Sequence, residues 1–304
     1  MSMAANPTRP EYRAAGTDLS ERRRSGVSRG ALLDVVAPAG VEPTPDGGLR
    51  LGALTTIAAL AADPAIRAGY PGLAAAAAGL ATPQIRRMAT LGGNIAQRNR
   101  CWYFRNPDIA CLKKGGDACP ARAGNALYAV AFDSAPCVAP HPSTLAAALL
   151  AYDARLDTNQ RRDAPIAEVL GDGRAASAET ALGPGELITA VALPAPASNE
   201  RAFYKRAIGR AYAEWPLVEL VLRASVEGGV FARLRLVAGG VAPVPLRLHA
   251  AEAAALGKPA SATTFAAAAA AAIEGANPLP QSRYKLDLLH GLLRDLLEQA
   301  ASPG

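Results

Sequence analysis

The chain has 304 residues, of which half are apolar and 19% are charged, and its formal net charge is +6 at pH 7. This composition excludes an intrinsically disordered protein and gives enough length for two or three domains. The positive charge is small for the length, and its arginines are scattered without interleaved aromatic residues, so the sequence does not predict a nucleic-acid surface.

The first half of the chain is predicted to contain short strands and helices joined by turns. We expect strands at residues 32–36, 49–52, 153–157 and 187–193. We expect helices at residues 55–64, 70–80 and 142–150, and Thr55 or Thr56 can cap the first of them. Residues 81–145 stand apart as a polar, turn-rich segment that holds every cysteine of the chain.

The second half begins after residues 194–199, which are predicted to be an inter-domain linker. Strands are expected at residues 202–206, 217–226 and 231–238. Two helices are then expected to close the chain. The first is alanine-rich and ends at Glu274, and the second carries a stripe of leucines on one face, at positions 286, 289, 292, 293, 296 and 297.

Four cysteines lie close together in the sequence: Cys101, Cys111, Cys119 and Cys137. Four thiolates can provide the one terminal ligand that each iron of a [4Fe–4S] cluster needs. The basic residues between them, Lys113, Lys114 and Arg122, can offset the negative charge of the thiolates. Glycines at positions 115, 116 and 124 let backbone amides turn toward the sulfurs. The pattern therefore favours an iron–sulfur cluster.

Two other roles for the cysteines stay open on the residues alone. Two disulfides are typical of small secreted domains, whereas this chain is large and residues 1–10 show no signal peptide. A structural zinc site usually shows two tight C-x2–4-C pairs, and the spacing here is C-x9-C-x7-C-x17-C.

Two glycine turns could hold a phosphate group. They are Ala15-Gly16-Thr17-Asp18 and Gly92-Gly93-Asn94. Glycine lets the backbone approach a pyrophosphate and point amides at it, and neighbouring hydroxyl and amide side chains can add hydrogen bonds. Neither turn fits G-x-G-x-x-G, so a Rossmann-type dinucleotide site is disfavoured.

Four motifs in order along the chain resemble the FAD-binding subunit of the xanthine dehydrogenase family of molybdenum hydroxylases. They lie at residues 14–19, 81–95, 204–218 (with Arg210 and Ala211) and 234–245. Residues 97–105, the three later cysteines and residues 139–143 are similar to the flavin subunits of bacterial periplasmic aldehyde oxidoreductases. Those subunits carry an extra [4Fe–4S] cluster at this loop.

The resemblance implies an α+β fold with FAD between two small α/β domains of the vanillyl-alcohol-oxidase type. These would be residues 1–54, with a start that is truncated relative to the family, and residues 55–193, with the [4Fe–4S] loop at 97–141. A C-terminal α+β domain with an antiparallel sheet would span residues 200–304.

The resemblance also implies which residues bind FAD. The pyrophosphate would be wrapped by Arg13, Ala14, Ala15, Gly16, Thr17, Asp18 and Leu19. The second flavin loop would be Ala89, Thr90, Gly93, Asn94, Ala96 and Gln97. Ser143 would contact the adenosine half, Leu187 and Ile188 would pack by the flavin, and Lys205 would lie near the ring system. The chain departs from the family at Ala15, where glycine is usual, and at Thr144, where aspartate is usual.

The implied function is electron transfer in a three-subunit oxidoreductase for aldehydes or purine-like heterocycles. A large subunit would hold molybdopterin, and a small one would hold two [2Fe–2S] clusters. Electrons would reach FAD on this chain and leave to an external acceptor, with no catalytic residue of its own. The competing hypotheses are a zinc-stabilised nucleotide-binding protein without redox activity and a paralogue that has lost FAD. We expect a protein of the cytoplasm, or of the periplasm by co-export with a partner, and no membrane span.

Overall fold

The computed structural model describes residues 10–209 and 213–302. Its N-terminal part holds two sheets. Strands β1 (Glu11–Arg13) and β2 (Leu32–Asp34) pair in parallel. A larger antiparallel sheet has the order β3-β4-β7-β5-β6. Its strands are β3 (Val41–Pro43), β4 (Leu49–Gly52), β5 (Arg155–Thr158), β6 (Ala164–Pro165) and β7 (Ile188–Leu193).

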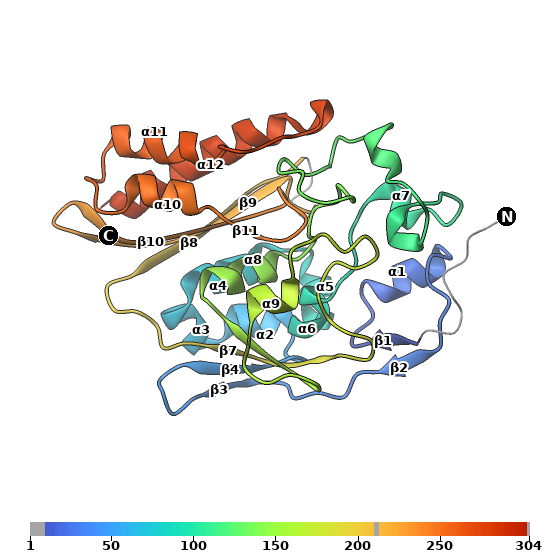
Figure 1. Ribbon diagram of the computed structural model, residues 1–304. Coiled ribbons are helices and arrows are strands. Elements are labelled where there is room, and N and C mark those ends of the chain that lie inside the picture. The colour runs from blue at the N-terminus through green and yellow to red at the C-terminus, as the bar shows by residue number, and fades with distance from the viewer. Residues whose placement is uncertain (1–9, 210–212, 303–304) are drawn as a thin grey trace.

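The strand expected at residues 49–52 is confirmed as β4. It pairs with β7 along its whole length, with Leu51 opposite Val191, and both residues are fully buried. The expected domain boundary at residue 54 therefore separates β3 and β4 from the rest of their own sheet. Among the described residues before residue 55, β1, β2 and the helix α1 (Leu19–Arg24) lie apart from that sheet (Figure 1).

Short helices cover the larger sheet. They are α2 (Ile57–Ala62), α3 (Pro64–Gly69), α4 (Pro71–Gly79), α5 (Pro83–Met88), α6 (Leu91–Ile95), α8 (Thr144–Ala151) and α9 (Ile166–Leu170). Side-chain caps fix several of their starts: Thr56, the second of the two predicted caps, accepts from the Ala59 amide, and Ser143 accepts from the Ala146 amide. The helix expected at residues 70–80 is confirmed as α4, and Pro71 is its first residue.

The C-terminal half is an antiparallel sheet covered by helices on one face (Figure 1). The sheet order is β11-β10-β9-β8, and the strands are β8 (Arg201–Ala207), β9 (Val218–Glu227), β10 (Val230–Gly239) and β11 (Leu246–Arg247). Its helices are α10 (His249–Ala255), α11 (Ala262–Ala271) and α12 (Tyr284–Ala301). The leucine stripe is confirmed: the leucines at 289, 292, 293, 296 and 297 of α12 are buried in this core.

Two closing helices were expected, and three are present. The alanine-rich region is divided because Gly257, at φ +71°, turns the chain after α10, and α11 then starts anew from a Ser261 cap. The alanine-rich helix also ends at Ala271 and does not reach Glu274. Of the helices in the described ranges, none combines the length and the apolar character needed to cross a membrane.

The two halves share a packed seam. Helices α4 and α8 lie against the face of the C-terminal sheet that α12 leaves open, and Val221 and Val237 of that sheet join the core of the first half. Across the seam, Arg223 donates to the Ala151 carbonyl at 2.6 Å, and Arg235 lies 2.6 Å from the carboxylate of Asp153. The halves are therefore held at a fixed separation by packing and by hydrogen bonds.

Residues 97–141, here called the cysteine segment, join neither sheet. They contain only α7 (Trp102–Arg105) and the short 3-10 turns η1 (Leu112–Lys114) and η2 (Pro120–Arg122). A third 3-10 turn, η3 (Pro280–Ser282), leads into α12 and holds the segment's far side, because the Ser282 hydroxyl donates to the Val130 carbonyl at 3.0 Å. The segment thus reaches from α1 to the C-terminal helices (Figure 1).

Candidate functional site

The two glycine loops meet at one cavity of about 130 Å³, here called the flavin-loop cavity. Its walls include residues 12–19, the approach to β7 at residues 186–188, and five residues of the second loop: Thr90, Gly92, Gly93, Ala96 and Gln97. Thirteen of the seventeen residues predicted to bind FAD line it: Arg13, Ala14, Ala15, Gly16, Thr17, Asp18, Leu19, Thr90, Gly93, Ala96, Gln97, Leu187 and Ile188. The other four are Ala89, Asn94, Ser143 and Lys205.

Glycine is needed at particular points of these loops. Gly16 has φ +72°, in the left-handed region that favours glycine. A Cβ on Gly93 would lie 2.9 Å from the Thr90 hydroxyl, which accepts from the Gly93 amide and so caps the turn. Ala15 has no positive φ. The first loop therefore accommodates the methyl group of Ala15 where the family usually has glycine.

Asn94 and Ser143 lie side by side next to the cavity wall. The Ser143 hydroxyl donates to Asn94 Oδ1 at 2.7 Å, and Gln97 donates to the backbone carbonyls of Asn94 and Pro142. The start of α8 is thereby fixed to the second flavin loop, although the two are about fifty residues apart in sequence. Thr144, at the position usual for aspartate, instead turns its hydroxyl to Glu219 and Tyr204.

Lys205 is placed differently. Its ammonium group lies 2.5 Å from Asp295 of α12, both side chains are exposed, and Lys205 does not line the flavin-loop cavity. Its predicted place near the flavin ring gains no support from these contacts. Arg210 and Ala211, which belong to the third motif, lie outside the described residues.

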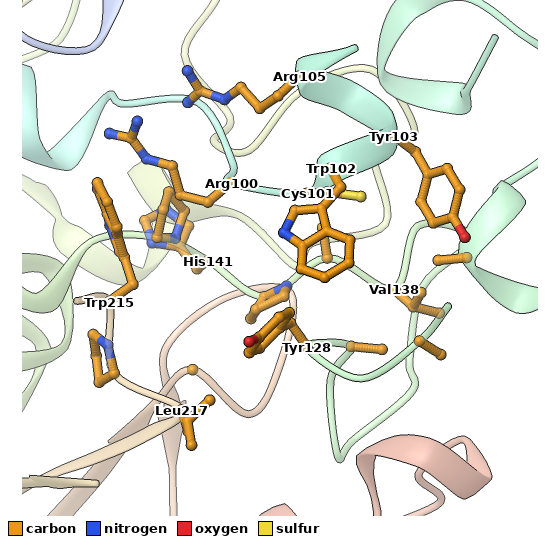
Figure 2. Close-up of a pocket in the computed structure, with 18 of the residues that line it drawn as sticks. Arg100, Cys101, Trp102, Tyr103, Arg105, Tyr128, Val138, His141, Trp215 and Leu217 are labelled. Atoms are coloured by element: carbon orange, nitrogen blue, oxygen red, sulfur yellow. The ribbon is translucent and has the colours of Figure 1, made fainter. Parts of the chain in front are cut away.

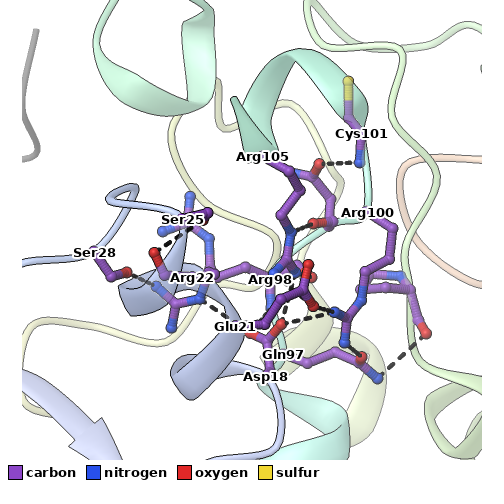
Figure 3. Close-up of polar contacts among 12 residues, drawn as sticks. Asp18, Glu21, Arg22, Ser25, Ser28, Gln97, Arg98, Arg100, Cys101 and Arg105 are labelled. Carbon is purple, nitrogen blue, oxygen red and sulfur yellow. Dashed lines mark hydrogen bonds and ion pairs between the residues drawn. The ribbon is translucent and has the colours of Figure 1, made fainter. Parts of the chain in front are cut away.

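Arginine side chains surround the carboxylate of Asp18, as Figure 3 shows. Its carboxylate lies 2.6 Å from Arg105 and 3.1 Å from both Arg22 and Arg100, and it accepts from the Arg98 amide at 3.2 Å. Burial alone would raise the pKa of Asp18, but Arg100 and Arg105 outweigh it and hold that pKa below its usual range. The first flavin loop is therefore tied directly to the cysteine segment.

Glu179 is a second anchor, and the sequence offered no motif for it. Its buried carboxylate accepts from the Asn99 side chain at 2.7 Å and lies 2.5 Å from Arg98. Burial would raise the pKa of Glu179, but Arg98 and Lys113 keep it below its usual range. This carboxylate fixes the residues just before Cys101 from a loop eighty residues away.

The four cysteines lie in the same region. Cys111 and Cys137 are buried, and Cys101 and Cys119 are half-buried. The Cys137 thiol donates to the Cys119 sulfur, which lowers the pKa of Cys119 and raises that of Cys137. Among the described residues, no group of three or more histidine, cysteine, aspartate or glutamate side chains is gathered as a metal site.

Backbone amides donate to the cysteine sulfurs. Cys101 accepts from the amides of residues 103 and 104, Cys119 from those of residues 121 and 138, and Cys137 from that of residue 139. Amide donors of this kind stabilise thiolate sulfur and tune iron–sulfur centres. The donor set therefore fits the chemistry of a thiolate-bound cluster, even though the thiols are not gathered around one point.

The basic residues of the segment are engaged in local contacts. Lys113 donates to the Ala178 carbonyl, and Lys114 donates to the Tyr103 carbonyl at 2.9 Å. Arg122 forms a two-pronged ion pair with Asp133, at 2.6 and 2.7 Å. Their charges remain near the cysteines, but that of Arg122 is largely balanced by Asp133.

A second cavity, of about 450 Å³, lies between the cysteine segment and the C-terminal sheet (Figure 2). We call it the aromatic cavity, because Trp102, Tyr128 and Trp215 lie in its wall. Three buried polar groups, those of His141, Glu219 and Lys285, also line it. No sequence motif predicts that these three side chains meet.

Comparison with known proteins gives the family. The family described as "FAD binding domain in molybdopterin dehydrogenase" matches residues 33–196, more than half of the chain. The "CO dehydrogenase flavoprotein C-terminal domain" matches residues 202–300. The chain belongs to the FAD-binding subunits of the molybdenum hydroxylase family. It is thus an oxidoreductase subunit, and a non-redox zinc protein finds no support.

Individual relatives agree with this assignment. The aldehyde oxidoreductase FAD-binding subunit PaoB of Escherichia coli K12 is 34% identical over 303 residues, which cover 95% of this chain and 91% of that one. The carbon monoxide dehydrogenase of Hydrogenophaga pseudoflava has the same fold, with a TM-score of 0.69 at 22% identity, over 96% of this chain and 88% of that one. Quinoline 2-oxidoreductase of Pseudomonas putida 86 gives 0.72 at 20% identity, over 96% and 89%. The α+β fold is confirmed.

Proposed function

We propose that this FAD-binding subunit holds FAD in the flavin-loop cavity and one [4Fe–4S] cluster on its four cysteines, and relays electrons within a larger complex. The observation that carries the proposal is the convergence of thirteen predicted FAD residues on one cavity, from loops more than 150 residues apart. The second support is the direct tie between that cavity and the cysteine segment through Asp18.

FAD would be held mainly by backbone and small polar groups. Residues 13–19 and 90–97 offer amides at glycine turns that bring the main chain close to a pyrophosphate. Thr17 and Asn94 add side chains that can bond phosphate or ribose oxygens, with Ser143 supporting Asn94. Leu187 and Ile188 give an apolar wall. The role of Lys205 stays a prediction outside this set.

Cys101, Cys111, Cys119 and Cys137 would ligate the iron–sulfur cluster. Supporting this are the amide donors to three of the sulfurs and the burial of two of the thiols. When bound, such a cluster supplies a one-electron site beside the flavin. The chain's own part would be to orient the thiolates, to exclude water with Phe104 and to keep cations close.

We also propose that the subunit works with a molybdopterin-binding large subunit and a [2Fe–2S] small subunit. Its relatives in Escherichia coli are named as FAD-binding subunits. Electrons from those partners would pass through FAD to an external acceptor. Three domains, at residues 1–54, 55–193 and 200–304, would carry these tasks.

Flavin content tests the FAD site. The purified chain should release free FAD on heating, because neither glycine loop has a histidine or cysteine for covalent attachment. Asn94→Ala should weaken FAD binding by about 1–3 kcal/mol, since a hydrogen bond to the cofactor and its link to Ser143 are lost. Asn125→Ala, on the exposed side of the cysteine segment, is the matched control. Unchanged flavin affinity in Asn94→Ala would remove Asn94 from the site.

Metal analysis tests the cluster. We expect four irons and four sulfides per chain, from the composition of the cluster. One zinc and no iron would contradict the proposal for the cysteines while leaving the FAD site untouched. Assembly is tested separately: the isolated chain should accept electrons from artificial donors but should not oxidise aldehydes or purines without its partner subunits.

A further inference from the structure

Helix α5 has an exposed apolar side. None of its six residues is buried, and Ile85 and Met88, which lie one turn apart on the same side, are 39% and 57% exposed. A short helix usually owes its stability to an apolar face that packs against the rest of the protein. Over the described ranges of the chain, no other segment buries these two side chains.

Hydrogen bonds at its two ends hold α5 in place. Thr82 caps the first turn, because its hydroxyl accepts from the Ile85 amide at 3.3 Å. The Arg86 side chain donates to the carbonyls of the two residues before this cap, at 2.8 and 2.7 Å. At the other end, the Ala89 carbonyl accepts from the Ile57 amide at 2.9 Å. These contacts fix the helix without using its apolar side.

Helix α5 leads directly into the second flavin loop. Met88 comes two residues before Thr90, which lines the flavin-loop cavity and forms a β-bridge with Thr56 at the cap of α2. Residues 83–88 themselves line neither the flavin-loop cavity nor the aromatic cavity. The helix is therefore an exposed element beside the FAD site that contributes no wall to either cavity.

The surface of α5 is basic as well as apolar. Two of its six residues are arginines, and none is a carboxylate. Arg87 is exposed and forms no ion pair in the part of the chain that the structure describes. Methionine and arginine are enriched at protein–protein interfaces, whereas lysine and glutamate are depleted there. A protein that fits this surface needs an apolar patch bordered by carboxylates, because complementary charges steer and align two partners.

We propose that α5 docks the electron-donating [2Fe–2S] subunit, which would contact Ile85 and Met88 through an apolar patch and Arg87 through a carboxylate. This inference rests on the proposed function, since it requires that electrons enter FAD from another chain. Their donor has to approach the flavin-loop cavity from outside, and α5 joins an uncovered apolar side to a wall of that cavity. The molybdopterin subunit has no such requirement, because it would pass its electrons to the [2Fe–2S] subunit.

Site-specific cross-linking in the co-expressed three-subunit complex tests the docking directly. Photoreactive p-benzoylphenylalanine in place of Met88 should attach to the [2Fe–2S] subunit, and mass spectrometry of the linked peptide would identify it. The same replacement of Leu256, a similarly exposed residue after α10 (49%), is the control and should not attach to that subunit. Attachment from position 88 to the molybdopterin subunit, to a second copy of this chain or to no chain would overturn the proposal.

Matched variants separate the apolar contact from the charged one. Met88→Glu should weaken binding of the [2Fe–2S] subunit by about 10-fold, measured by calorimetry, and should leave the FAD content unchanged. Leu256→Glu should alter neither. Arg87→Gln should reduce the dependence of the affinity on salt concentration, whereas Arg294→Gln, on the exposed side of α12, should not. Unaltered binding in both Met88→Glu and Arg87→Gln would overturn the proposal.

The outcomes distinguish this inference from the proposed function. If the chain holds FAD and accepts electrons from artificial donors, but position 88 does not link to the [2Fe–2S] subunit, the docking surface is wrong and the proposed function stands. If the chain holds no FAD, the proposed function fails, and the cross-link from position 88 still decides whether α5 contacts the [2Fe–2S] subunit.

Discussion

In the C-terminal half, β9 and β10 pair almost along their whole length, and the apolar side chains of their sheet close against α10, α11 and α12. The cysteine segment has no strand, and its two small apolar clusters centre on Val130 and Phe104. It is held instead by ion pairs and hydrogen bonds to Asp18, Glu179 and the turn before α12. The C-terminal half is stabilised by apolar burial, and the cysteine segment by ion pairs and hydrogen bonds.

The difference teaches where each region's stability comes from. Apolar burial is worth about 25 cal/mol per Å² and needs no cofactor, so the C-terminal sheet and its helices can form on the chain alone. Polar ties contribute much less net free energy, because each replaces hydrogen bonds to water. The stability of the cysteine segment should therefore depend on the group that its thiols bind.

Loss of one thiol should affect the cysteine segment most strongly. Cys111→Ala is expected to abolish cluster binding and to open residues 97–141 to limited proteolysis, since metal binding would supply much of this segment's folding free energy. The C-terminal half should stay resistant. Iron analysis and mass spectrometry of the fragments would measure this, with chelator-treated wild-type protein as the control. Full iron content in Cys111→Ala would contradict the cluster assignment.

Loss of a core leucine should lower the stability of the C-terminal half and leave cofactor binding unchanged. Leu293 is fully buried in the core under α12, so Leu293→Ala should lower the free energy of unfolding by about 2–5 kcal/mol. Iron and flavin contents at low temperature should remain at wild-type values. Urea unfolding would measure the effect. Leu256→Ala, at a half-exposed position after α10, is the control and should change the free energy by no more than about 0.5 kcal/mol.

Glu219, at the seam between the two halves, should make the free energy of unfolding depend on pH. Its folded pKa is raised by burial from 4.5 to about 7, so the folded state holds the proton more tightly than the unfolded state. Its contribution to stability is therefore complete below pH 4.5 and is lost as the pH rises through about 7. At about 1.4 kcal/mol per pKa unit, the loss is of the order of 3 kcal/mol.

Glu219→Gln should flatten this pH dependence, because the amide does not titrate. Urea unfolding at a series of pH values between 4.5 and 8 would measure the slope. Glu298→Gln, at an exposed position of α12, is the matched control. A slope that is equal in wild-type protein and in Glu219→Gln would show that another group titrates at the seam.

The smallest effect concerns the tie between the flavin loop and the cysteine segment. Arg105→Gln removes the 2.6 Å contact with Asp18 but leaves Arg22 and Arg100 in place. We expect a loss of about 1 kcal/mol in FAD affinity, because the first loop is held less firmly. Arg155→Gln, in an exposed ion pair with Asp163, should change nothing measurable. Flavin titration would compare the two variants.

The sequence was most informative where local rules decide the structure. Thr56 caps α2, residues 49–52 form β4, and the leucine spacing of α12 places one face in the core. The glycine loops were also predicted, because Gly16 adopts a positive φ and a Cβ on Gly93 would crowd the Thr90 hydroxyl. Such features depend on neighbours within a few positions.

Features that depend on distant residues were not found. Glu179 reaches Asn99 across eighty positions, and Asp18 collects Arg100 and Arg105 from a similar distance. Nothing in the composition near these carboxylates marks them as anchors. The boundary expected at residue 54 runs through one sheet for the same reason: the pairing of β4 with β7 is a long-range contact.

Helix α8 carries a further consequence. Its eight residues, from Thr144 to Ala151, are all buried except Leu150, which is half-buried, because the helix lies between the two sheets with neighbours on every side. Four of the eight are alanines, which leave little room for a larger side chain. Over evolutionary time, substitutions can accumulate on the outer helices, whereas α8 can accept them at little more than one position.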